Sequence, residues 1–196
     1  MLTDNQKKVL RYLIINQDNF PSINQVAKDN NLAPNGALKI LNKFKEEGIL
    51  KIKQISNIKA YYINYNNNIT RNFLELALIT KIEDKKIKNR INDLISLKNI
   101  SNICILFGSY IEKNKKPNDL DILFVLKKEN FTKYKKQLNE LKNIIPITIH
   151  DMILTKEDLI QNIKMKKPII LNIIKNGYIL WGHSDIVEVL INVNKR

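Results

Sequence analysis

Two aspartates one residue apart, Asp119 and Asp121, stand at the start of an apolar run that extends to Leu126. Side chains on a strand alternate between its two faces, so this spacing places both carboxylates on the same face. Carboxylate oxygens are the hard ligands that Mg²⁺ prefers, and Mg²⁺ shares its coordination sphere with substrate phosphates. The pair therefore predicts a divalent-metal site that acts on a phosphate-bearing substrate.

A Gly-Ser pair, Gly108-Ser109, ends the preceding apolar run, and nine residues separate it from Asp119. Glycine lets the backbone approach a phosphate closely, and backbone N–H groups and a serine hydroxyl are suitable donors to it. The connection is long enough for the two apolar runs to be neighbouring strands. In that case the Gly-Ser turn and the carboxylates would meet at one end of a sheet.

Gly108-Ser109, nine intervening residues and Asp119-x-Asp121 together resemble the signature of the polymerase-beta-like nucleotidyltransferase superfamily, above all its minimal prokaryotic members. The resemblance covers roughly residue 67 to the C-terminus. It implies transfer of an NMP from an NTP, with ATP the expected donor, to the hydroxyl of an unknown acceptor. It also implies two Mg²⁺ (or Mn²⁺) ions held by three carboxylates, Asp119 and Asp121 among them. By the same resemblance the triphosphate is held by Gly108 and Ser109, and its charge is offset by Lys113, Lys115 or Lys116.

The third carboxylate is expected on the strand predicted over residues 147–154. Asp151 is the expected ligand, and His150 is the alternative. Alternation places Asp151 on the same face as Ile147 and Ile149. The better metal ligand of the two therefore lies on the more apolar face, unless the strand bends or bulges. If neither residue reaches the metals, the domain would bind nucleotide without catalysis. A second function therefore stays open: a DNA-binding transcription regulator whose nucleotidyltransferase-like domain senses nucleotide or dimerises.

Residues 1–66 predict three helices and a hairpin. Thr3-x-x-Gln6 and Ser22-x-x-Gln25 have the form of capping boxes and begin helices over about 4–16 and 23–30. Pro34 suits the first turn of a third helix that ends before Gly48. Two short alternating segments, 50–55 and 59–63, then form the hairpin.

This order of elements resembles the winged helix-turn-helix domains of prokaryotic regulators. The resemblance implies that the third helix enters the major groove of DNA and that lysines of the hairpin contact the backbone. An RNA partner is the alternative. The expected nucleic-acid contacts are Asn35, Lys39, Asn42, Lys43, Lys51 and Lys53.

The fold class expected is α+β, an N-terminal winged helix (three helices plus β-hairpin) followed by a minimal nucleotidyltransferase core. The polar break at residues 66–68 marks the boundary of the first domain. A connecting helical segment spans 67–98, as one long helix or as two with a bend near Asp84. The nucleotidyltransferase domain, 99–196, would hold a small mixed sheet (100–107, 120–126, 147–154 and an edge strand at 179–181) flanked by helices.

The composition adds a basic charge balance. Lys and Arg number 33 against 19 Asp and Glu, a net charge of +14, which favours a polyanionic partner. The charge is spread over both parts of the chain, and a general richness in Lys, Asn and Ile accounts for some of it. No apolar stretch approaches the length of a membrane span and no signal-peptide pattern begins the chain, so we expect a cytoplasmic protein. A protein or tRNA acceptor and a homodimer are left open.

Overall fold

The computed structural model describes residues 2–16, 19–55, 57–112, 117 and 119–194. The chain divides into two compact units, one made of Met1–Leu78 with Leu190–Arg196 and the other of Ile79–Val189. Within the described ranges no helix has both the length and the apolar character needed to cross a membrane.

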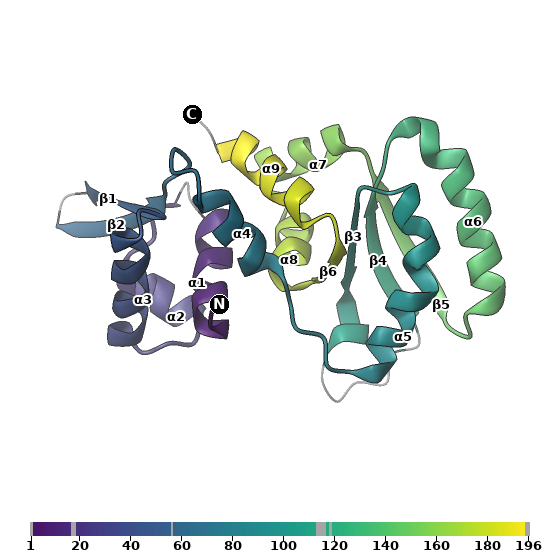
Figure 1. The fold of residues 1–196 in the computed structure, drawn as a ribbon, viewed down its shortest axis with the longest axis horizontal. Coiled ribbons are helices and arrows are strands. Elements are labelled where there is room, and N and C mark those ends of the chain that lie inside the picture. Colours follow the sequence, from purple (N-terminus) through teal and green to yellow (C-terminus); the bar gives the residue numbers. More distant parts are fainter. Residues whose placement is uncertain (1, 17–18, 56, 113–116, 118, 195–196) are drawn as a thin grey trace. The chain divides into compact units, whose positions relative to one another are not determined.

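The first unit begins with three helices and a hairpin, as predicted (Figure 1). Thr3 caps the first helix in a capping box, because its side chain accepts from the backbone N–H of Gln6 at 3.3 Å while the Gln6 side chain accepts from the N–H of Thr3 at 2.9 Å. The apolar stripes of the helices meet in a core in which Leu10, Leu41 and Phe44 are completely buried. The elements are α1 Asp4–Ile15, α2 Ile23–Asp29, α3 Pro34–Glu46, β1 Leu50–Ile55, β2 Ile58–Ile63 and α4 Thr70–Leu78.

The connecting segment forms two helices and not one. The chain leaves helical structure after Leu78, and α5 begins at Lys85, with Asp84 as its N-cap. The Asp84 side chain accepts from the backbone N–H of Lys86 at 2.7 Å, which fixes the start of the new helix. The β-branched residues of 79–82 favour helix weakly. Of the two alternatives, two separate helices are observed, the second beginning after Asp84.

The second unit contains a four-stranded mixed sheet in the order β5-β4-β3-β6. β3 (Ile103–Phe107) pairs antiparallel with β4 (Asp119–Val125) and with β6 (Tyr178–Trp181), and β4 pairs parallel with β5 (Thr148–Leu154). The edge strand expected at 179–181 is therefore present. The other elements are α5 Lys85–Leu94, the 3₁₀ turns Ile95–Asn99, Gly108–Ile111 and Lys128–Asn130, and helices α6 Phe131–Ile144, α7 Lys156–Lys164, α8 Pro168–Asn176 and α9 His183–Asn194. The part of α9 from Leu190 onward is counted with the first unit.

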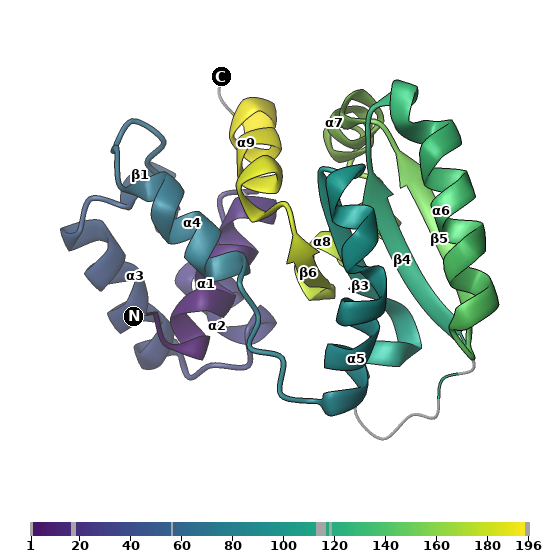
Figure 2. The ribbon, with the colours of Figure 1, turned by 45° about the vertical axis from the view of Figure 1, so that its right-hand side comes forward.

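One face of this sheet packs against α5 and α6, which run alongside it in Figures 1 and 2. The core between them contains Leu106 from β3, Ile122 from β4, Leu94 from α5 and Leu138 from α6. Cys104 lies in the same core, and burial raises the pKa of its thiol well above the ordinary value. The cysteine is therefore a small buried hydrophobe.

Candidate metal centre

The register of three strands brings the predicted carboxylates to one end of the sheet. Phe107, the last residue of β3, is the partner of Asp121, and Asp121 is in turn the partner of His150 on β5. Residues opposite each other on paired strands share a face. Asp119, two residues before Asp121, shares it as well. Two carboxylates and one imidazole therefore project from the face that α5 and α6 do not cover.

The three side chains are close enough to hold one ion. Nδ1 of His150 lies 3.4 Å from Oδ2 of Asp119 and 3.6 Å from Oδ1 of Asp121. Two ligand atoms at about 2.1 Å from one metal are roughly 3.0 to 3.4 Å apart in octahedral or tetrahedral geometry. The separation of 3.4 Å lies at the upper end of that range, and the separation of 3.6 Å lies just above it. The side chains are 36%, 27% and 59% exposed for Asp119, Asp121 and His150, so an ion can enter from solvent.

Gly108 closes the site from the side of β3. Its φ is +74°, a left-handed conformation that glycine adopts at little cost. A Cβ built at this position would collide with the carboxylate of Asp121. The backbone at Gly108 therefore lies directly against that carboxylate, and Ser109 follows in the turn Gly108–Ile111. The Gly-Ser turn and the aspartate pair meet as the nine-residue connection allowed.

Asp151 is not part of this cluster, which corrects its assignment as the third ligand. The register between β4 and β5 is continuous, with Ile122 as the partner of Asp151, so the side chain points to the opposite face. There its carboxylate accepts from Nζ of Lys142 at 3.0 Å and from the Tyr134 hydroxyl at 3.3 Å. Burial, and then the nearby Asp151 charge, raise the pKa of Tyr134 above its ordinary value. Both partners are on α6, so Asp151 ties this helix to the sheet.

The other residues predicted to bind the triphosphate, Lys115 and Lys116, lie outside the described residues, as does Lys113. Sequence reasoning did not single out Lys142 or Tyr134. The sequence gives little indication of their role. Their shared partner, Asp151, is an acid on the face of its strand that otherwise carries apolar residues.

Removing the Asp151 charge tests the two faces separately. We expect Asp151→Asn to leave the affinity for a divalent cation within about threefold, because the carboxylate does not face the site. The free energy of unfolding should fall by about 1–2 kcal/mol, since the variant lacks the charge-assisted hydrogen bond to Lys142. Urea denaturation followed by the fluorescence of the single tryptophan, Trp181, measures that decrease. Loss of metal binding with unchanged stability would contradict the placement.

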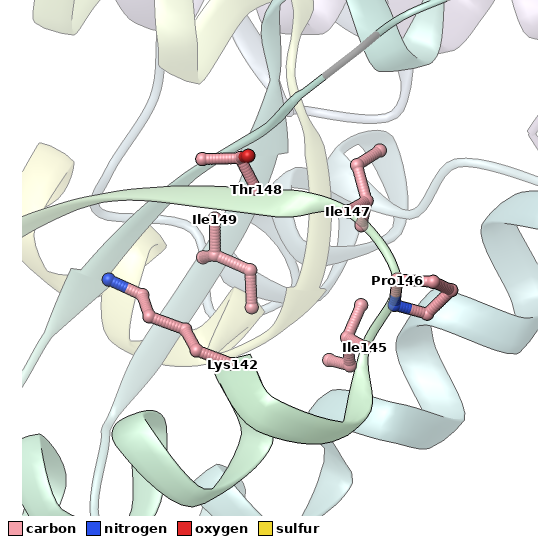
Figure 3. A pocket seen from close by; sticks show the side chains of 6 residues that line it. All are labelled: Lys142, Ile145, Pro146, Ile147, Thr148 and Ile149. Carbon is pink, nitrogen blue, oxygen red and sulfur yellow. The ribbon is translucent and has the colours of Figure 1, made fainter.

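A surface hollow of about 510 Å³ lies around the start of β5 (Figure 3). In Figure 3 the side chain of Thr148 lies on the opposite side of the strand from those of Ile149 and Lys142, as alternation requires. Thr148 is the register partner of Asp119, so the hollow reaches the strand end that carries the metal ligands. None of the three ligands lines it. Its lining residues are Lys142, Ile145, Pro146, Ile147, Thr148 and Ile149.

In the first unit, three of the predicted nucleic-acid contacts on α3 are accessible. Asn35, Lys39 and Lys43 are exposed. The ammonium of Lys43 lies 3.8 Å from a carboxylate oxygen of Glu47, one turn further along the helix. Exposed pairs of this kind contribute a few tenths of a kcal/mol, so Lys43 remains accessible to a competing phosphate.

The remaining contacts are engaged to different degrees. Asn42 is half-buried, and its side-chain oxygen accepts from the hydroxyl of Tyr61 on β2 at 2.7 Å. It therefore links α3 to the hairpin and is not a free reader of bases. Lys51 is exposed on β1, while Nζ of Lys53 lies 4.7 Å from the centre of the Phe20 ring in a cation–π contact. Lys51 is thus the more available of the two lysines on β1.

The structure places a Gly-Ser turn against a pair of carboxylates at one end of a mixed sheet. The Polymerase beta, Nucleotidyltransferase family matches residues 85–186, which is more than half of the chain, and the chain belongs to that family. The match begins at the start of α5 and ends within α9, so it contains the whole sheet and the site. No curated protein and no solved structure shows a significant match to the chain.

Proposed function

We propose that the protein transfers an NMP from an NTP to an acceptor hydroxyl at the site formed by Asp119, Asp121 and His150. The observation that supports this most is the convergence of their ligand atoms, all within 4.8 Å of one another, beside the Gly-Ser turn. Family membership supplies the reaction class. The residues fit a divalent cation, because two carboxylates supply hard oxygen ligands and the imidazole adds a nitrogen.

In the proposed mechanism the chain acts by positioning. The carboxylates of Asp119 and Asp121 would hold a divalent cation, Mg²⁺ or Mn²⁺. When bound, that ion would lower the pKa of the acceptor hydroxyl and offset charge on the phosphates. The backbone at Gly108 and the hydroxyl of Ser109 hold the triphosphate. The acceptor oxygen forms a bond to the α-phosphorus, the bond to pyrophosphate breaks, and the acceptor proton passes to solvent. ATP is the proposed donor.

Label transfer tests the proposal directly. Each NTP, radiolabelled at the α-phosphate, is incubated with the protein and Mg²⁺ or Mn²⁺, with protein, tRNA and cell extract as acceptors. We expect transfer by the native protein and none by the Asp119→Ala/Asp121→Ala double variant. The labelled band identifies the class of acceptor. Transfer that survives in the double variant would overturn the assignment of the site.

A non-catalytic role is the second candidate, and one observation favours it. The third position of the cluster is an imidazole, and the acid that could have filled it, Asp151, faces α6. Two carboxylates and an imidazole offset less cationic charge than three carboxylates would, which weakens binding of a second metal ion. Under this candidate the protein is a DNA-binding regulator whose second unit senses nucleotide or dimerises. Nucleotide binding without transfer to any acceptor would favour it.

For the first unit we propose a winged helix that binds nucleic acid, DNA or RNA, through α3 and the hairpin. The proposal is supported by the order of its elements and by the exposure of Lys39, Lys43 and Lys51 along them. The net charge of +14 favours association with a polyanion. Such a unit would hold the catalytic unit on nucleic acid or control expression of the protein itself.

Replacing two lysines of α3 tests this interface. We expect Lys39→Ala with Lys43→Ala to weaken DNA binding and to reduce the slope of log affinity against log salt by about 2, because each lysine neutralises one phosphate. Fluorescence anisotropy with a duplex at several salt concentrations gives the slope. Lys85→Ala with Lys88→Ala on α5 is the matched control, because both lysines are exposed and the change in net charge is the same. Equal slopes for the two double variants would contradict the assignment.

A further inference from the structure

The face of β5 that points into the metal centre offers nitrogen and no carboxylate. Alternation and the continuous register place Thr148, His150 and Met152 on that face. Thr148 lies opposite Asp119, and His150 lies opposite Asp121. The hydroxyl and thioether are weak ligands of hard cations, so His150 is the residue of β5 that is suited to complete the site.

The imidazole of His150 already faces both carboxylates. The nitrogen that approaches Asp119 and Asp121 is Nδ1 in each case, at 3.4 Å and 3.6 Å. A single ring nitrogen thus lies where a shared ion would be bound. Its side chain is 59% exposed, so burial in the core does not account for a histidine at this position. The imidazole is accessible to an ion that enters from solvent.

Ligand type decides which cation such a site prefers. Mg²⁺ binds almost entirely through oxygen and gives up its bound water reluctantly, whereas first-row transition metals accept imidazole nitrogen well. The two carboxylates keep the site suited to a phosphate-bound ion. A mixed set of two carboxylates and one imidazole therefore favours a transition-metal dication that tolerates both.

We infer that His150 makes this centre select Mn²⁺, as a first-row transition-metal dication, over Mg²⁺. The inference rests on the proposed function only in that both concern the same metal site. His150 ligates the ion through Nδ1, and Asp119 and Asp121 complete the protein ligands. Substituting an acid, His150→Asp, converts the set to three carboxylates and removes the preference.

The test measures binding and ligation without nucleotide turnover. Mn²⁺ is titrated into the native protein and followed by electron paramagnetic resonance, and Mg²⁺ is added as competitor. Pulsed measurement of the bound Mn²⁺ detects coupling to a ligated nitrogen. We expect that coupling in the native protein and none in His150→Asp. The ratio of Mn²⁺ to Mg²⁺ affinity should be at least about tenfold higher in the native protein, the scale on which changes at a metal site alter affinity.

His183→Ala is the matched control, since it removes the only other histidine of the chain and should retain both the coupling and the ratio. Absence of nitrogen coupling in the native protein, or an unchanged affinity ratio in His150→Asp, would overturn the inference. The proposed function fails separately. Nitrogen-coupled Mn²⁺ with no label transfer would support the metal preference and refute the enzyme, whereas label transfer without nitrogen coupling would do the reverse.

Discussion

Asp121→Asn is expected to lower the rate of nucleotidyl transfer about a thousandfold, because charge stabilisation by a bound metal contributes several kcal/mol to the transition state and each 1.4 kcal/mol is worth about tenfold. The variant is nearly isosteric and keeps one oxygen. It lacks the charge that holds the cation and the carboxylate that lies against Gly108. The effect should appear in the turnover rate at saturating metal.

The free energy of unfolding of Asp121→Asn, in contrast to its transfer rate, should not decrease. Asp119 and Asp121 lie on one face, and each is approached by the imidazole of His150, at 3.4 Å and 3.6 Å. Without a metal the two like charges repel, so removing one relieves repulsion in the folded state. We expect the free energy of unfolding without metal to stay equal or rise slightly. A fall of about 2 kcal/mol or more, measured by urea denaturation, would assign Asp121 a structural role.

Asp185→Asn is the control for this variant. Asp185 lies in the first turn of α9 and also carries a carboxylate, but it is not in the metal cluster. It should keep transfer within about twofold of the native rate. A comparable decrease in both variants would show that the assay reports a general effect of charge.

The predicted site shows what a single sequence determines. The approach of the Gly-Ser turn to Asp121 followed from two apolar runs joined by a short connection, because adjacent runs of that kind pair as neighbouring strands. The parallel pairing of β5 beside β4 also agreed with the expected mixed sheet. These features depend on the alternation of apolar residues and on the lengths of connections, both of which can be read directly from the sequence.

Of the two candidates for the third ligand, His150 lies in the cluster and Asp151 does not, for a physical reason that the sequence also contained. The chemistry of a carboxylate favours Asp151 as a metal ligand, whereas alternation along the strand places it on the apolar face. The register with β4 runs without a shift along Thr148–Leu154, so alternation determines which face the Asp151 side chain takes. On that face the carboxylate accepts hydrogen bonds from Lys142 and Tyr134 of α6. A strand without an interruption fixes the face of every residue more strongly than residue type does.

Other details depend on contacts between distant residues. Asn42 is outward in the helical pattern of α3, yet Tyr61, nineteen residues later, reaches it with a hydrogen bond. Similarly, the cation–π contact between Lys53 and Phe20 joins residues with no shared periodicity. Such pairings arise from tertiary packing, and no local sequence pattern predicts them.

Gly108→Ala should be nearly as damaging to transfer as the removal of a metal ligand. The backbone at this position has φ of +74°, where a side chain costs about 1–2 kcal/mol, and the new Cβ would displace the Asp121 carboxylate. A shift of about 1 Å in a reacting group can cost roughly a hundredfold in rate. We therefore expect transfer to fall at least about a hundredfold, with weaker metal binding and a free energy of unfolding lower by about 1–3 kcal/mol.

Gly36→Ala separates this effect from the general consequence of adding a methyl group. Gly36 lies in α3, and among the described residues no heavy atom outside its own helical backbone and chain neighbours lies within 4 Å of the position that a Cβ would take. Alanine favours helix over glycine by about 0.5–1 kcal/mol. The control should keep transfer and gain slightly in stability, as followed by circular dichroism. If Gly108→Ala retained both transfer and Mn²⁺ affinity, the contact between this glycine and Asp121 would not be what holds the carboxylate in the metal centre.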